Sequence, residues 1–165
     1  MAQARFLRHL LAPLFLLAGI LSARATDYYV SPSGLDTQLG TEAAPWLTLQ
    51  HAADTLTPGD RVLVRSGTYA AVKVNVSGSA AAGPVTFTNY PGESPVIDAT
   101  GVTPPAGDSA LFLIKDHSYV IVSGFELRNY KTTIASRVLA GILITGACSH
   151  VEIRNCHVHG IWNTG

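Results

Sequence analysis

The chain has 165 residues, a length that suits one domain, and carries 11 basic and 11 acidic side chains. No cluster of lysine and arginine supplies the concentrated positive charge that nucleic acid binding requires, which excludes that class of partner. Beyond the N-terminus, no apolar segment approaches the roughly 20 residues needed to span a bilayer.

The N-terminus has the three parts of a secretory signal peptide. Arg5 and Arg8 give a basic start, Leu10–Leu21 is apolar, and Ala23-Arg24-Ala25 is a small-x-small cleavage site. We therefore predict a signal peptide over 1–25 and an exported protein, secreted, periplasmic or at the cell surface. An uncleaved N-terminal anchor is the alternative.

Signal cleavage changes the charge of the chain. It removes three of the eleven basic residues and none of the acidic ones, which leaves a net charge of about −3 with neutral histidines. Export also allows a disulfide between Cys148 and Cys156. However, Cys156 is at an inward strand position, which favours a buried, unpaired thiol.

The mature chain begins with a segment, about 26–60, that we interpret as an N-terminal cap. It contains a short strand, a loop rich in Gly, Pro, Ser and Thr, and one short amphipathic helix. Thr48 is the expected N-cap, and Leu49, Ala53 and Leu56 share one helical face. Pro58-Gly59-Asp60 ends this helix.

From about residue 61 to 165 the sequence is a series of short strands separated by Gly, Pro, Asn or Ser. Ten such strands without an intervening helix form either a sandwich or a solenoid. The strand-like segments are RVLVRSGTY, VKVNV, PVTFTNY, SPVID, ALFLI, SYVIV, GFELRNY, GILIT, HVEIR and CHVHG.

An internal repeat favours the solenoid. Ala110–Tyr130 aligns without a gap on Gly141–Ile161, at a shift of 31 residues, with apolar residues on apolar residues. This alignment places Phe112 and Leu143 at outward positions of the first strand. Gly124 aligns with Asn155 where the alternation breaks, and both residue types tolerate a left-handed backbone, so we expect a tight corner there.

The corner divides HVEIRNCHVHG into two strands with four inward residues: Val151, Ile153, Cys156 and Val158. Successive coils would stack as parallel strands about 4.8 Å apart and bury their apolar faces against each other. The predicted fold is an all-β, right-handed parallel β-helix with three short strands per coil and a short capping helix. HGIWNTG begins a coil that it does not close, so we expect an N-terminal fragment of a longer solenoid.

The segments YYVSPSG, GTEAAPW, PGDRVLVRSGTY and PVTFTNYPGESPVID, followed by coils of this length, resemble secreted proteins of the pectate-lyase-like superfamily. The N-terminal half is similar to polysaccharide lyase family 9. The resemblance implies a β-helix that binds an acidic polysaccharide such as pectate or alginate and, in full-length form, cleaves it by β-elimination. A non-catalytic surface or adhesion β-helix is the alternative.

The candidate substrate-binding residues are Lys131, Arg137, His157 and His159. The two histidines share one face beside Glu126 and Arg128, either as a patch that contacts acidic sugars or as a solvated polar ladder. Lys131 and Arg137 lie in the insertion 131–140, a loop that could face a polyanion.

No catalytic residue can be assigned from the sequence. Family 9 lyases use a calcium-binding Asp cluster and a lysine base, but Asp98, Asp108 and Asp116 are isolated in or beside turns. His157 and His159 lack the further His or Cys ligands of a zinc site. We predict no metal site in this sequence, with Ca²⁺ as a cofactor only of the full-length protein.

Overall fold

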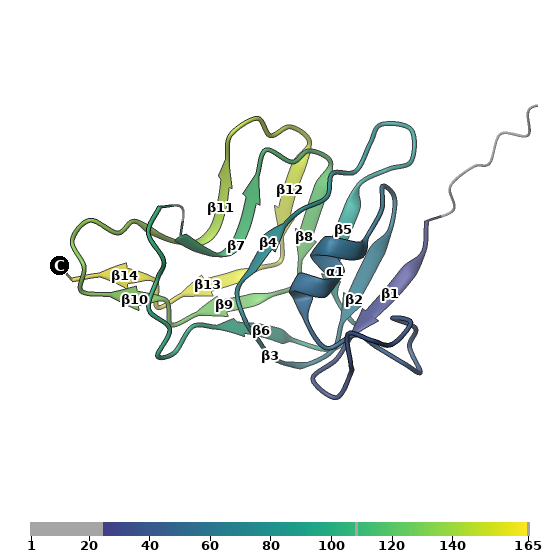
Figure 1. The fold of residues 1–165 in the computed structure, drawn as a ribbon, viewed down its shortest axis with the longest axis horizontal. Coiled ribbons are helices and arrows are strands. Elements are labelled where there is room, and N and C mark those ends of the chain that lie inside the picture. Colours follow the sequence, from purple (N-terminus) through teal and green to yellow (C-terminus); the bar gives the residue numbers. More distant parts are fainter. Residues whose placement is uncertain (1–24, 108, 165) are drawn as a thin grey trace, which may run out of the picture.

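The structure is a computed structural model that describes residues 25–107 and 109–164. The predicted signal peptide, apart from Ala25, and Asp108 lie outside the described residues. Three parallel sheets wind around one core (Figure 1). Within the described residues, no helix is long and apolar enough for a membrane crossing.

The first sheet has the strand order β1-β2-β5-β8-β12, and the second has the order β3-β6-β9-β13. The first comprises β1 Asp27–Val30, β2 Arg61–Val64, β5 Val85–Asn89, β8 Val120–Ser123 and β12 Val151–Arg154. The second comprises β3 Gly67–Tyr69, β6 Pro95–Asp98, β9 Glu126–Arg128 and β13 His157–His159.

The third sheet has the order β4-β7-β11, and a separate two-stranded pair joins β10 to β14. Their bounds are β4 Val72–Val74, β7 Ser109–Lys115, β11 Leu139–Thr145, β10 Lys131–Thr132 and β14 Trp162–Asn163. Every pair between these strands is parallel, which confirms the predicted solenoid of short strands. The insertion 131–140, expected as a loop, contains β10 and the start of β11.

The N-terminal cap forms as the sequence predicts. Helix α1 spans Leu49–Thr55, and the Thr48 hydroxyl accepts a hydrogen bond from the His51 amide at 3.1 Å. The turn after the helix is fixed by Asp60, whose buried carboxylate accepts bonds from both the amide and the hydroxyl of Thr57 at 2.8 Å. The apolar face of α1 therefore closes one end of the core.

The core lies between the three sheets and is continuous from coil to coil. Phe87, Phe112 and Phe125 are fully buried and pack edge to face, with ring centroids 5.4 and 5.9 Å apart. Cys148 and Cys156 are unpaired and pack against this core. Ile144 and Val158, expected in the core, are 44% and 43% exposed.

The outward position predicted for Phe112 is wrong. In the structure β11 pairs with β7 at a shift of 30 residues, so Phe112 faces Ile142 and Leu113 faces Leu143. The next strands pair at a shift of 31. The reason is the preceding turn: residues 146–150 connect β11 to β12, one residue more than residues 116–119 between β7 and β8.

The predicted corner is confirmed. Gly124 and Asn155 both have a left-handed backbone, with φ of 77° and 51°. Each corner connects the first sheet to the second through two residues, 124–125 and 155–156.

A serine ladder links the turns that enter the first sheet. The Ser77 hydroxyl accepts a bond from the Ser118 amide at 3.1 Å, and the Ser118 hydroxyl accepts one from the Ser149 amide at 3.0 Å. These bonds satisfy turn amides that no strand pairs, so they hold successive coils in register.

Candidate functional site

The outer face of the second sheet carries a ladder of charged side chains from three successive strands. β6, β9 and β13 place Asp98 beside Arg128 and Arg128 beside His159, and they place Glu126 beside His157. We call these five residues the charged ladder. Arg128 bonds Asp98 through Nε at 2.7 Å and Glu126 through Nη1 at 2.9 Å.

The two histidines belong to this ladder. Their rings stack with centroids 4.6 Å apart, and His159 Nε2 lies 3.0 Å from Glu126 Oε1. Both side chains are exposed. The predicted neighbours Glu126/His157 and Arg128/His159 are therefore confirmed, and the ladder pairs its charges internally.

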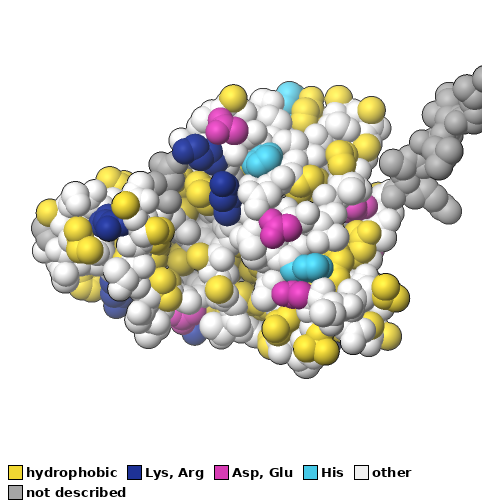
Figure 2. All heavy atoms as spheres, viewed as in Figure 1, with side chains coloured by type: hydrophobic (Ala, Val, Ile, Leu, Met, Phe, Trp, Pro, Cys, Tyr) yellow, Lys and Arg dark blue, Asp and Glu magenta, His cyan; other side chains and the backbone are white. Residues whose placement is uncertain are grey.

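Hydrogen bonds keep the ladder carboxylates ionised. The Thr100 hydroxyl and the Arg128 guanidinium hold the pKa of Asp98 well below its usual range, with further bonds from Asn129. His159 and then Arg128 lower the pKa of Glu126. On the face shown in Figure 2, charged side chains are interspersed with apolar and uncharged ones, and neither sign forms a continuous patch.

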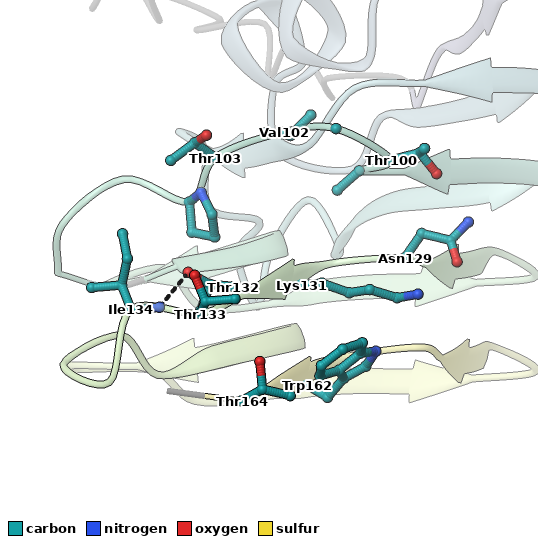
Figure 3. Close-up of a pocket in the computed structure, with 13 residues that line it drawn as sticks. Thr100, Val102, Thr103, Asn129, Lys131, Thr132, Thr133, Ile134, Trp162 and Thr164 are labelled. Carbon is teal, nitrogen blue, oxygen red and sulfur yellow. Dashed lines mark hydrogen bonds between the residues drawn. The ribbon is translucent and has the colours of Figure 1, made fainter.

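Next to the ladder is a cavity of about 620 Å³, which we call the loop groove (Figure 3). It lies among the connections that leave the second sheet and the pair β10–β14, at the end of the molecule away from α1. Its lining residues are Ala99, Thr100, Gly101, Val102, Thr103, Pro104, Asn129, Lys131, Thr132, Thr133, Ile134, Trp162 and Thr164.

Lys131 and Trp162 are the side chains of this groove best suited to bind a ligand. They are register partners in β10 and β14, and Lys131 Nζ lies 5.2 Å from the centroid of the Trp162 ring. The Trp162 side chain is 45% exposed. Asn129, which also lines the groove, donates to both carboxylate oxygens of Asp98 at 3.2 and 3.3 Å, and so joins the groove to the charged ladder.

The structure separates the four residues that the sequence nominated. Lys131 lines the loop groove, whereas His157 and His159 lie in the adjoining ladder. Arg137 does not line the groove; its Nη1 donates to the carbonyl of Pro104 at 3.1 Å and ties one connection to the other. Trp162 was missed, although the shift of 31 residues, carried one position further, aligns it with Lys131.

A second cavity, of about 590 Å³, lies on the other side of the connection 99–105. Its lining is mainly apolar and includes Leu113 of β7, Val102 and Pro105, with Lys73 and Gln50 as polar members. Ala99 and Val102 line both cavities, so this one connection forms a wall of each.

The described residues do not fit a metal ion. Among them, no group of three or more His, Cys, Asp or Glu is arranged to bind one. Asp98 and Glu126 already accept bonds from Arg128, and Asp116 accepts a bond from the Ala147 amide at 2.8 Å. We therefore derive no catalytic step that uses Ca²⁺ or zinc from these residues.

The stacked parallel coils and the helical cap define the class of protein as a β-helix. Residues 28–165 match the family described as "Pel9A-like, right handed beta helix region". The chain belongs to this family.

Two curated relatives agree with this assignment. The chain is 34% identical over 140 residues to "Uncharacterized protein YwoF" of Bacillus subtilis, covering 84% of this chain and 30% of YwoF. It is 39% identical over 92 residues to "Pectate lyase PEL9" of Emericella nidulans, covering 53% of this chain and 22% of that protein. The chain thus spans less than a third of either relative.

Solved structures with the same fold include a rhamnogalacturonan lyase, with a TM-score of 0.70 at 21% identity over 82% of this chain and 37% of that one. Pectate lyase Pel9A has a TM-score of 0.60, also at 21% identity, over 82% of this chain and 34% of Pel9A. At this identity the likeness shows the fold alone.

Proposed function

We propose that this protein binds an acidic polysaccharide, such as pectate or alginate, in the loop groove. The observation that carries the proposal is the pairing of the Lys131 ammonium with the exposed Trp162 indole inside a groove of about 620 Å³. The names of the relatives, which include pectate lyases, support this class of substrate.

The groove offers what a uronate residue needs. The apolar face of a sugar ring packs on the exposed indole of Trp162, and the sugar carboxylate pairs with Lys131. Lys131 makes no ion pair with any described residue, so its charge is available to a ligand. Asn129 and the threonines of the groove supply hydrogen bonds to sugar hydroxyls.

The proposal extends to export and cleavage by the whole protein. A sugar polymer outside the cell is reached after removal of the signal peptide at 1–25. In β-elimination, a base takes the proton beside the carboxylate, its electron pair forms a carbon–carbon double bond, and the glycosidic bond breaks. We assign the base to no residue of this chain, and Ca²⁺ stays a proposed cofactor of the full-length protein.

The binding site can be tested by isothermal titration of tetragalacturonate into the purified protein and its variants. Lys131→Ala and Trp162→Ala should each weaken binding about tenfold or more, because one charge-assisted contact or one stacking face is lost. Arg154→Ala and Leu39→Ala are matched controls, since each removes an exposed cation or apolar side chain outside the groove. Equal affinity in all four variants would contradict the proposed site.

Cleavage is tested separately by absorbance near 235 nm, where the unsaturated product of elimination absorbs. Release of this product from pectate or alginate by the full-length protein supports the lyase. Binding without product at any calcium concentration would instead identify the non-catalytic β-helix.

A further inference from the structure

A separate polar cavity of about 420 Å³ lies where the N-terminal loop meets the corners of the early coils. We call it the corner pocket. It shares no lining residue with the loop groove. Its lining residues are Tyr29, Ser31, Ser33, Glu42, Ala43, Pro45, Arg65, Ser66 and Glu93.

The corner pocket exists because one corner is longer than the others. The corners 65–66, 124–125 and 155–156 connect the first and second sheets through two residues, whereas residues 90–94 connect β5 to β6 through five. The extra residues bring Glu93 back to the preceding coil, where its carboxylate accepts bonds from Arg65 Nε at 2.7 Å and from the Ser66 amide.

These contacts hold a guanidinium in place while leaving part of it free. Arg65 lies over the Tyr90 ring, 4.2 Å from its centroid, and its side chain is 38% exposed. Only Nε of this guanidinium bonds a described residue, so Nη1 and Nη2 keep their donors available. An ion pair that served only to hold the corner to the neighbouring coil would not need this free, oriented fork.

The opposite wall of the pocket supplies a fixed acceptor. The Tyr90 hydroxyl donates to Glu42 Oε1 at 2.7 Å, and the second carboxylate oxygen of Glu42 has no partner among the described residues. The hydroxyls of Ser31 and Ser33, 3.0 Å apart, add groups that both donate and accept. The pocket therefore presents fixed donors, a fixed acceptor and adaptable hydroxyls around one space.

The charges decide which ligand suits this arrangement. Glu42 and Glu93 against Arg65 give a net charge of about −1, so an anion would meet two carboxylates and a cation would meet the guanidinium. A neutral sugar avoids both costs, because adjacent hydroxyls accept from a guanidinium and donate to a carboxylate. The half-buried Tyr29 ring adds an apolar surface for the sugar ring.

We propose that the corner pocket binds a neutral, diol-bearing sugar residue through Arg65 and Glu42. The cavity volume lies within the range of about 300–1,000 Å³ that is usual for small-ligand sites. This site is independent of the acidic-polysaccharide site in the loop groove and would give the protein a second contact to carbohydrate.

The test is a titration followed by ¹H–¹⁵N NMR of the purified protein, with galactotetraose, xylotetraose and cellotetraose as neutral probes and tetragalacturonate as the acidic one. At least one neutral probe should shift the backbone amides of Ser33 and Ser66. Arg65→Lys removes the fork but keeps the charge, and Glu42→Gln keeps an acceptor for Tyr90. Each should weaken neutral binding about tenfold, since each alters charge-assisted bonds.

Lys131→Ala should leave neutral binding unchanged, which separates this site from the loop groove. Thermal unfolding of each variant shows whether the fold is kept, and Glu42→Gln carries the test if Arg65→Lys does not fold. The proposal is overturned if no neutral probe shifts these amides. It is also overturned if tetragalacturonate shifts them equally, or if both folded variants bind as the parent does.

Discussion

Two kinds of turn in this protein do different work. Three of the corners between the first and second sheets contain two residues each, with Gly124 and Asn155 in a left-handed backbone. The connections 99–108 and 129–138, which lead from the second sheet to the third, contain ten residues each and line the loop groove. Short corners thus fix the register of the coils, while long connections create surfaces for binding.

This comparison predicts that substitutions at turns and core positions fixed by register change stability, whereas substitutions in the groove change binding. The long corner 90–94 fits the same relation, since the one corner that departs from two residues among the described coils forms a pocket.

The largest effect is expected where turn length decides which side chain is inward. Phe112→Ala should lower the free energy of unfolding by about 3–5 kcal/mol, because the ring is fully buried between two other phenylalanines. Leu113→Ala, on the half-buried outer side of the same strand, should cost about 1 kcal/mol. Urea denaturation measures both, and the reverse order would show that the 30-residue register is wrong.

A second test compares two glycines with the same backbone. Gly124 and Gly92 both have φ of 77°, but a Cβ at Gly124 would overlap the side-chain oxygen of Asn89, whereas a Cβ at Gly92 meets nothing within 4 Å. Gly124→Ala should cost about 2–4 kcal/mol, and Gly92→Ala about 1–2 kcal/mol from backbone strain alone. Equal losses of stability would mean that the short corner is not tightly packed.

Asn155 offers a milder test of the same corner. Asn155→Val should destabilise the fold by about 1–3 kcal/mol, because a β-branched residue strains at a φ of 51°. Asn155→Gly should be nearly neutral. Thermal melts that coincide for the two variants would contradict the assignment of this corner as the feature that sets register.

Asp98 joins the end of β6 to the first long connection, and its effect depends on pH. Because its pKa is lowered in the folded protein, its contribution is present at neutral pH and is lost as the pH falls below about 4, the range of an unperturbed Asp. Asp98→Asn should therefore be less stable at pH 7 and lose less stability in acid than the parent. Glu152→Gln, in an exposed ion pair, is the control with little expected effect.

The smallest effect is expected in the charged ladder. If the histidines only keep the outer sheet face solvated, the double substitution His157→Ser and His159→Ser should leave far-UV circular dichroism and tetragalacturonate binding intact. Loss of binding with an unchanged spectrum would move the ladder into the binding site and blur the division between sheets and connections.

Much of the fold could be predicted because its signals are local. Thr48 and the sequence Pro58-Gly59-Asp60 mark the ends of the helix, and Gly124 and Asn155 mark the corners by residue type alone. The orientation of Phe112 could not be predicted by a gap-free alignment. The turn 146–150 contains an extra residue between segments whose apolar patterns match equally well at either shift.

The candidate sites depend on contacts between coils, which single residue types do not reveal. Lys131 was found from its charge, but its partner Trp162 is an ordinary lone aromatic until stacking brings the two together. Arg137 has the same charge, yet it bonds the backbone at Pro104 instead of facing the groove. Arg65 and Glu93 meet only because an early corner is three residues longer than its counterparts.

The serine ladder bears on how such a chain can lengthen in evolution. Each hydroxyl from Ser77 to Ser118 receives an amide of the following turn, and Ser149 repeats the residue type in the third position. A tandem duplication of one such unit would place the same acceptor beneath the same donor, so the new coil would dock on its parent without any further substitution. Gene duplication can therefore add coils to this architecture one at a time, while the long connections diverge separately.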